Sequence, residues 1–347
     1  MMATISDVAA RAGVSISTVS YVLSGKRSIS SATAARVEKA IEELGYRPNA
    51  GAQMLASAST KIIAFSAPMH SETYPMSFMA FVLSVVGAAR AHGYDVILLT
   101  ESGEDAVEGI RRVVGTDLVD GIVMMDVALD DPRVDVIRSL DIPAVVIGLP
   151  KDSRDLACVD LDFGAAARLC VDSLAEKGHR ALALIGHPTA LYERDMGFAW
   201  RFRRAFLDRA AELGLDAVFV PTDGEDPLVG ALGELPGLSA LVLDCNEYQV
   251  EAVLSSARSR GLLAADARPE GLSVLVACAS FDTDRFAIPL DVVPLDATQS
   301  GTRAVDMLLS LMRGSAPRVE LYSPEYRERG SVRRAWPALK RGAPDQG

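Results

Sequence analysis

The chain has 347 residues, of which 49% are hydrophobic and 23% charged, and its formal net charge is −11. This length predicts more than one domain, and the composition is typical of a globular protein with ample core. No stretch approaches the roughly 18 uninterrupted apolar residues of a membrane helix, and the N-terminus lacks the basic and apolar segments of a secretion signal. We therefore expect a cytoplasmic protein rather than a membrane or secreted one.

The first predicted element is a short helix in the segment TISDVAARAG, residues 4–13. Thr4 and Asp7 have the spacing of a capping box, and Gly13 stands where a helix ends. Its apolar residues recur at helical spacing and form one stripe; they are Ile5, Val8, Ala9 and Ala12.

A second short helix is predicted in the segment GVSISTVSYVLSG, residues 13–25. Ser15 is a good N-cap, and an inward apolar stripe follows at Val19, Val22 and Leu23. The outward residues are polar but uncharged, whereas a merely solvated helix would usually carry Glu and Lys. Hydroxyl groups and a tyrosine can contact phosphates and base edges. The two helices predict a helix-turn-helix, the alternative being an ordinary helical hairpin in a bundle.

A third helix is predicted from Ser30, a second N-cap, to Gly45, with apolar residues at Val37, Ala40, Ile41 and Leu44. The sequence then reads LGYRPN, followed by Ala52-Gln53-Met54-Leu55. Together with TISDVAARAGVS and TVSYVLSG, these segments resemble the N-terminal headpiece and hinge of the lactose-repressor/galactose-repressor (LacI/GalR) family of transcription regulators. The resemblance covers about the first sixty residues without a gap.

The resemblance implies that this region binds DNA, with Ile16, Ser17 and Tyr21 contacting bases. It also implies that residues 49–57 form a short helix only when paired with a dimer mate on an operator, because so short a segment is not stable alone. Leu55 would then wedge into the minor groove; alternatively, it packs on the core as part of a linker. The candidate DNA-binding residues are Thr4, Ser15, Ile16, Ser17, Thr18, Ser20, Tyr21, Ser24, Ser30, Thr33, Tyr46, Asn49, Ala52, Gln53 and Leu55.

The charge is unevenly distributed along the chain. Residues 1–60 hold six Lys/Arg and four Asp/Glu, a net charge of +2, so the remainder carries 29 basic and 42 acidic residues, a net charge of −13. The larger part should therefore avoid DNA while the small domain approaches it. A headpiece with only +2 binds weakly alone, which favours a homodimer presenting two headpieces.

From Lys61 onward, buried strands alternate with helices, which predicts parallel doubly wound sheets. The expected strands cover 62–65, 96–99, 121–125, 144–147, 181–186, 240–243 and 273–276, and the expected helices 76–91, 164–177, 196–213 and 247–260. Glycines 93, 178, 214 and 261 stand at helix ends. The predicted fold class is an all-α helix-turn-helix headpiece followed by an α/β core of two such sheets, similar to periplasmic binding proteins.

Two sheets in tandem with a cleft between them suit a module that closes on a small molecule, and in the family this is the effector-binding core. In such cores the chain crosses between subdomains three times, here predicted near Cys158, Ile288 and Arg318. The expected domains are 1–48 for the headpiece, 49–60 for the hinge, 61–158 with 288–317 for the first subdomain, 159–287 with 318–337 for the second, and 338–347 for a tail.

Polar and aromatic residues near strand ends are the candidates for effector binding. Asp162 has an alternative role as a helix cap, and Asp282 as a turn former, whereas His92 and His179 are expected at the surface. The candidates are His70, Phe78, Asp162, His187, Tyr192, Arg194, Phe202, Asn246 and Asp282.

Two departures from the family pattern concern this cleft. Phe202 stands three residues before the small-aromatic pair Ala205-Phe206, where sugar-binding members have an arginine, and Leu295 replaces a glutamine. An arginine clamp is a strong way to hold a diol. We therefore expect an effector more apolar than a free monosaccharide, such as a glycoside or a related metabolite.

The remaining signals argue against catalysis. Cysteines 158, 170, 245 and 278 are far apart in apolar surroundings, so we expect buried free thiols. The sequence has no dinucleotide or phosphate loop, no nucleophile elbow and no metal-spaced ligand set, so we expect no enzyme activity, cofactor or metal. The prediction is a homodimeric repressor controlled by a small molecule, the rival being a stand-alone sugar-binding protein.

Overall fold

In the computed structural model, residues 3–24, 29–46, 59–263 and 271–335 are described. They divide into two compact units, one formed by Met1–Lys61 with Asp117–Asp120 and the other by Ile62–Thr116 with Gly121–Gly347. The predicted hinge residues Asn49, Ala52, Gln53 and Leu55, and the predicted tail 338–347, lie outside the described residues.

Within its described residues, the first unit contains the helices α1 (Ile5–Ala12), α2 (Ile16–Ser24) and α3 (Ser31–Leu44). The predicted capping box of Thr4 and Asp7 is present, and Gly13 and Gly45 end their helices in the left-handed conformation. Val8, Val19 and Val37 form the fully buried centre of this unit. Leu44, the last residue of α3, does not join it and is exposed.

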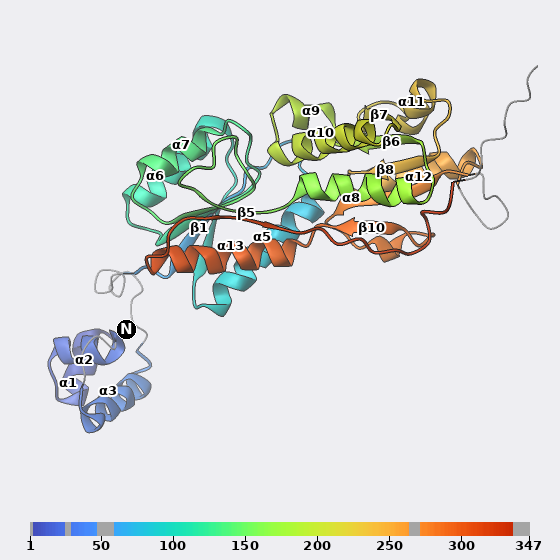
Figure 1. Ribbon diagram of the computed structural model, residues 1–347. Coiled ribbons are helices and arrows are strands. Elements are labelled where there is room, and N and C mark those ends of the chain that lie inside the picture. The colour runs from blue at the N-terminus through green and yellow to red at the C-terminus, as the bar shows by residue number, and fades with distance from the viewer. Residues whose placement is uncertain (1–2, 25–28, 47–58, 264–270, 336–347) are drawn as a thin grey trace, which may run out of the picture. The chain divides into compact units, whose positions relative to one another are not determined.

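The second unit contains two parallel sheets (Figure 1). The first sheet has the order β11-β5-β4-β3-β1-β2. Helices α5 and α13 cover one face, and α6 and α7 lie together on the other (Figure 1). The strands are β1 (Ile62–Ser66), β2 (Asp95–Leu99), β3 (Gly121–Met124), β4 (Ala144–Ile147), β5 (Ala157–Leu161) and β11 (Val319–Tyr322), and the helices are α5 (Pro75–Ala91), α6 (Gly103–Gly115), α7 (Pro132–Ser139) and α13 (Ala297–Met312).

The second sheet has the order β10-β9-β8-β6-β7. Alternate residues of β6 enter two different hydrophobic clusters, Leu182 and Leu184 one and Ala183 and Ile185 the other, because successive side chains of a strand point to opposite faces. Both faces are therefore buried. The strands are β6 (Ala181–Gly186), β7 (Asp216–Pro221), β8 (Ala240–Leu243), β9 (Ser273–Ala279) and β10 (Asp291–Pro294), and the helices are α8 (Phe163–Glu176), α9 (Thr189–Glu193), α10 (Gly197–Glu212), α11 (Pro227–Glu234), α12 (Glu247–Ser259) and the short η1 (Thr283–Arg285).

The chain crosses between the sheets a few residues later than predicted. Strand β5 pairs with β4, so the first crossing follows Leu161 rather than Cys158. Strand β10 belongs to the second sheet, which moves the next crossing from Ile288 to beyond Pro294. Strand β11 pairs with β5, so the last crossing follows Tyr322 rather than Arg318. Where a strand ends depends on the strand with which it pairs, and the pattern of residues along one segment does not identify that partner.

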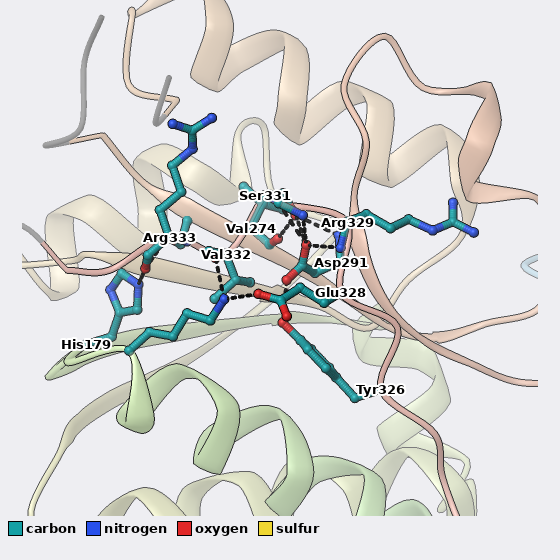
Figure 2. Close-up of polar contacts among 12 residues, drawn as sticks. His179, Val274, Asp291, Tyr326, Glu328, Arg329, Ser331, Val332 and Arg333 are labelled. Carbon is teal, nitrogen blue, oxygen red and sulfur yellow. Dashed lines mark hydrogen bonds and ion pairs between the residues drawn. The ribbon is translucent and has the colours of Figure 1, made fainter. Parts of the chain in front are cut away.

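After the last crossing, residues 326–333 run along the second sheet and are fastened to Asp291 (Figure 2). The Asp291 carboxylate accepts hydrogen bonds from the backbone N–H groups of Arg329, Gly330 and Ser331 and from the hydroxyl of Tyr326. Ser331 in turn donates its hydroxyl to Val274 of β9.

The expectation that His179 is a surface residue is wrong. Only 2% of it is exposed, and its ring nitrogens lie 3.0 Å from Ser239 Oγ and 2.9 Å from the carbonyl oxygen of Arg333. The returning C-terminal segment covers it (Figure 2), which no local pattern indicates.

Helices α5 and α13 approach closely at Gly301. A Cβ atom added there would lie 2.1 Å from Ser84 Oγ and 2.9 Å from the backbone nitrogen of Val85, so any larger residue would push the helices apart. In the described part of the chain, no helix combines the length and apolarity needed to cross a membrane.

Candidate DNA-reading helix and ligand cavity

Helix α2 presents an uncharged polar face. The Ser15 side chain caps it by accepting from the Thr18 N–H at 3.2 Å, and Ile16 is 50% exposed beside the exposed Ser17. Val19 is buried against α1 and α3, which turns the opposite side of the helix outward.

Several of the other candidate DNA-binding residues are already engaged within the headpiece. Thr4 and Ser30 cap α1 and α3, and Tyr46 packs against the headpiece core. Their hydroxyl or ring groups therefore have a structural role, whereas Ile16 and Ser17 stand at the exposed start of α2. Two of the three predicted base-reading residues thus lie at the exposed start of α2.

A cavity of about 400 Å³ lies between the two sheets of the second unit. Its walls are largely apolar and include several aromatic side chains, which suits an apolar or partly apolar ligand. The aromatic lining residues are Tyr74, Phe78, Phe81, Phe163, Phe198 and Phe281, and the charged ones are Glu72, Asp126, Asp160, His187, Arg194, Arg201 and Asp244.

One ion pair crosses the cavity from β5 to α10. Arg201 donates to Asp160 and to the carbonyl of Gly197, and its guanidinium lies 5.4 Å from the centre of the Phe163 ring. Burial raises the pKa of the Asp160 carboxyl to about 6, although Arg201 opposes the shift. The pair joins the two sheets through groups that are largely shielded from water.

A second ion pair joins Arg194, which follows α9, to Glu72, in the turn after β1. The Arg194 Nε atom is buried and has no hydrogen-bond partner among the described residues. A buried donor without an acceptor is unfavourable, which makes this N–H a candidate for binding a ligand atom.

The expected loss of a cavity arginine is therefore wrong. Phe202 is fully buried in the core beneath α10 and does not line the cavity, whereas Arg194 and Arg201 do. A second small-aromatic pair, Gly197-Phe198, occurs earlier in the sequence, and Arg194 stands three residues before it. The Gly197-Phe198 pair, rather than Ala205-Phe206, is therefore the sequence feature that locates the cavity arginine.

His187 and Asp244 lie at the ends of β6 and β8. The distance from His187 Nε2 to Asp244 Oδ1 is 3.6 Å, and the imidazole packs edge-on against Phe198. Asn246 also lines the cavity, but its side-chain oxygen accepts from the Gln249 N–H and so caps α12.

Asp126 follows β3 with a φ of +57°. Burial raises the pKa of its carboxyl to about 6. His70 does not line the cavity; its Nε2 lies 4.0 Å from Asp126 Oδ2, and burial lowers the pKa of this histidine, with Arg194 and Arg133 adding to the effect. His70 thus stands behind a lining residue.

Three further candidates lie elsewhere. Asp162 caps α8 by accepting from the Ala165 N–H, and Asp282 caps the short helix η1, which are the alternative roles considered for them above. Tyr192 is buried in an aromatic cluster with Trp200 and Phe219. The sequence analysis missed four cavity acids. Three of them lie at or just after the ends of buried strands, a position typical of ligand-binding residues in α/β sheets; they are Asp126, Asp160 and Asp244. The fourth, Glu72, lies in the turn between β1 and α5.

Comparison with known sequence families gives two matches. Residues 4–49 match the family described as bacterial regulatory proteins, lacI family, and residues 171–332 match the periplasmic binding protein-like domain. The first match contains α1, α2 and α3, and the second contains most of the second sheet with the C-terminal crossings.

Individual relatives are named as transcription regulators. The HTH-type transcriptional regulator AglR of Rhizobium meliloti is 33% identical, but the match covers only 59% of this chain and 56% of that protein. The repressor PurR of Glaesserella parasuis is 28% identical over 96% of this chain and 99% of its own. The chain thus spans little more than half of the first relative and almost all of the second.

Solved structures share the fold. A lac repressor dimer bound to operator and the anti-inducer ONPF has a TM-score of 0.80 at 22% identity, covering 96% of this chain and 100% of that one. A complex of the regulator CelR with cellobiose has a TM-score of 0.66 at 22% identity, covering 95% and 99%. These findings show that residues 4–49 belong to the lacI family of bacterial regulatory proteins and that the chain is similar over nearly its whole length to a repressor of the helix-turn-helix type, with the fold of the lac repressor.

Proposed function

We propose that this protein is a cytoplasmic, homodimeric transcription repressor that binds a palindromic operator and whose operator affinity is set by a small molecule in the cavity. The observation that carries the proposal is the presence in one chain of a helix-turn-helix with an uncharged polar α2 face and a unit with an aromatic-walled cavity of about 400 Å³. A stand-alone binding protein needs only the second feature.

On the DNA side, Ile16 and Ser17 at the start of α2 would contact base edges together with Tyr21. An isoleucine favours contact with thymine methyl groups, and a tyrosine cannot make the bidentate guanine contact of an arginine. The half-site should therefore differ from one read by arginine at the third position.

On the ligand side, the aromatic lining supports an effector with an apolar part, such as a glycoside. Phe78, Phe198 and Phe281 offer ring faces, while the unpartnered Nε of Arg194 supplies a donor for a hydroxyl or ether oxygen. The cellobiose and ONPF complexes among the structural neighbours concern those proteins, but they suit the same ligand class.

The control mechanism would be a population shift between closure states of the two subdomains. The Asp160–Arg201 and Glu72–Arg194 pairs join the first sheet's residues to the second subdomain. The Ser280 hydroxyl also donates to Ser77 of α5 at 2.7 Å. A ligand that alters these contacts differently in the two states changes the geometry presented to the partner protomer and to DNA.

Helix α5 offers an apolar surface for the dimer. Met76, Met79 and Leu83 recur at i, i+3 and i+7 on one side of the helix, and Leu83 is 64% exposed. Burial of such a stripe between two copies would stabilise a dimer. Leu83→Asp should lower the mass measured by light scattering from dimer to monomer, whereas Val229→Asp, at an exposed apolar residue of α11, should not.

The decisive experiment compares the full chain with a version lacking residues 1–60. The full chain should be retained on a DNA resin and select a palindromic site from random DNA, and the shortened chain should do neither while keeping its response to ligands in a thermal-shift screen. A ligand at about 100 times its dissociation constant adds about 2.7 kcal/mol of stability. Equal retention of both chains would refute DNA binding by the headpiece.

A further inference from the structure

We infer that the cavity selects against anions: its ligand is uncharged, and an added phosphate, sulfonate or carboxylate group weakens binding at least about tenfold. The inference rests on the proposed function of the cavity as the ligand site, and it concerns the charge of that ligand.

Acidic side chains outnumber basic ones around the cavity. Of the described residues that line it, four are acidic, Glu72, Asp126, Asp160 and Asp244, whereas the arginines are Arg194 and Arg201. His187 also lines the cavity, with its Nε2 atom 3.6 Å from Asp244 Oδ1. The lining therefore carries a net charge of about −2 above neutral pH.

Both arginines are already paired across the cavity. Arg201 of α10 binds Asp160 of β5, whose side chain is only 8% exposed, and Arg194 binds Glu72. An anionic ligand that bound either guanidinium in place of its carboxylate would leave that carboxylate unpaired in a partly buried site, which is unfavourable. The arginines therefore serve hydroxyl groups better than anionic ones.

The other two acids lie beside histidines and are not paired with either lining arginine. Asp244 lies beside His187 and Asp126 beside His70. The nearest arginine behind Asp126, Arg133, is buried and bound to Asp131, and its remaining N–H groups donate to Ser66 and to the carbonyls of Met125 and Asp126. Repulsion between these carboxylates and an incoming anion is strengthened because both carboxylates are shielded from water, with side-chain exposures of 25% for Asp126 and 3% for Asp244.

An uncharged ligand neither breaks these ion pairs nor is repelled by the carboxylates. The aromatic walls accept its apolar surface, while the carboxylates can accept hydrogen bonds from its hydroxyl groups. The same acids that repel an anion thus help to hold a neutral hydroxylated ligand.

Two fluorescent probes that differ in charge test the inference. N-phenyl-1-naphthylamine is uncharged, and 8-anilino-1-naphthalenesulfonate is the same aromatic framework carrying one sulfonate. At pH 8 the full-length protein should bind the sulfonate at least about tenfold more weakly than the neutral probe, a ratio equivalent to about 1.4 kcal/mol.

Variants connect this ratio to the cavity. Asp126→Asn and Asp244→Asn should each lower the ratio at least about threefold, an estimate from one removed like charge at partial burial. Asp208→Asn removes a charge from the exposed surface of α10 and should leave the ratio unchanged. Ser280→Trp, which fills part of the cavity, should abolish binding of the neutral probe.

Equal binding of both probes in the wild type, with loss of both in Ser280→Trp, would overturn the charge inference and leave the proposed ligand site intact. A ratio that neither Asn variant moves would also overturn it. Probe binding that survives both Ser280→Trp and Ser77→Trp, in variants shown to be folded by circular dichroism, would instead overturn the cavity as the ligand site and the inference with it.

Discussion

Replacing Asp291 by alanine removes the acceptor to which the C-terminal segment is fastened. The side chain is fully buried, and its Oδ1 atom accepts from the N–H groups of Arg329, Gly330 and Ser331 at 2.8, 2.6 and 2.9 Å. Its Oδ2 atom accepts from the Tyr326 hydroxyl. Asp291→Ala therefore leaves four donors without their acceptor beside the edge of the second sheet.

Hydrogen bonds to a charged group contribute about 1.5–3 kcal/mol each. The four donors share one carboxylate and their contributions are not additive, so we expect Asp291→Ala to lower the free energy of unfolding by about 4 kcal/mol. Asp291→Asn keeps one oxygen for the backbone donors and can turn its amide toward Tyr326, so its cost should be about 1–2 kcal/mol, reflecting the lost charge.

Urea unfolding of the full chain, followed by circular dichroism, measures both values. Asp296→Ala is the matched control, because Asp296 also accepts from two backbone N–H groups, those of Thr298 and Gln299, but is an exposed helix cap. Its loss should cost only about 1 kcal/mol. If Asp291→Ala were no more costly than this control, the fastening of the segment would not depend on the carboxylate.

Three further predictions concern the cavity and the DNA-binding region. Burial raises the Asp126 pKa from 3.8 to about 6, so its ionisation disfavours the folded state above pH 6, and this destabilisation is lost as the pH falls toward 4. Asp126→Asn should therefore stabilise the protein more at pH 8 than at pH 4 in urea titrations. An equal effect at both pH values would contradict the shift. Exchanging Ile16, Ser17 and Tyr21 should change the half-site selected from random DNA, and an unchanged half-site would exclude them as readers. Leu55→Ala should abolish DNA bending in a circular-permutation gel assay while ligand-induced stabilisation persists; normal bending would refute the minor-groove wedge.

The sequence by itself determined the local structure and the alternation of elements. Capping by Thr4, Ser15 and Ser30 and helix ends at Gly13 and Gly45 were predicted correctly, because a cap acts on backbone groups within about four residues. Buried strands alternating with helices predicted two parallel sheets, since a strand covered on both faces is apolar throughout.

Only the tertiary structure decided which distant residues meet. The Asp160–Arg201 pair joins residues from different subdomains, and His179 is covered by a segment more than 150 residues away in sequence. The crossing points depend on pairing between β5 and β11, which are likewise far apart in the chain. Such contacts arise from packing and register between whole elements, and neither is encoded in the spacing of residues within one element.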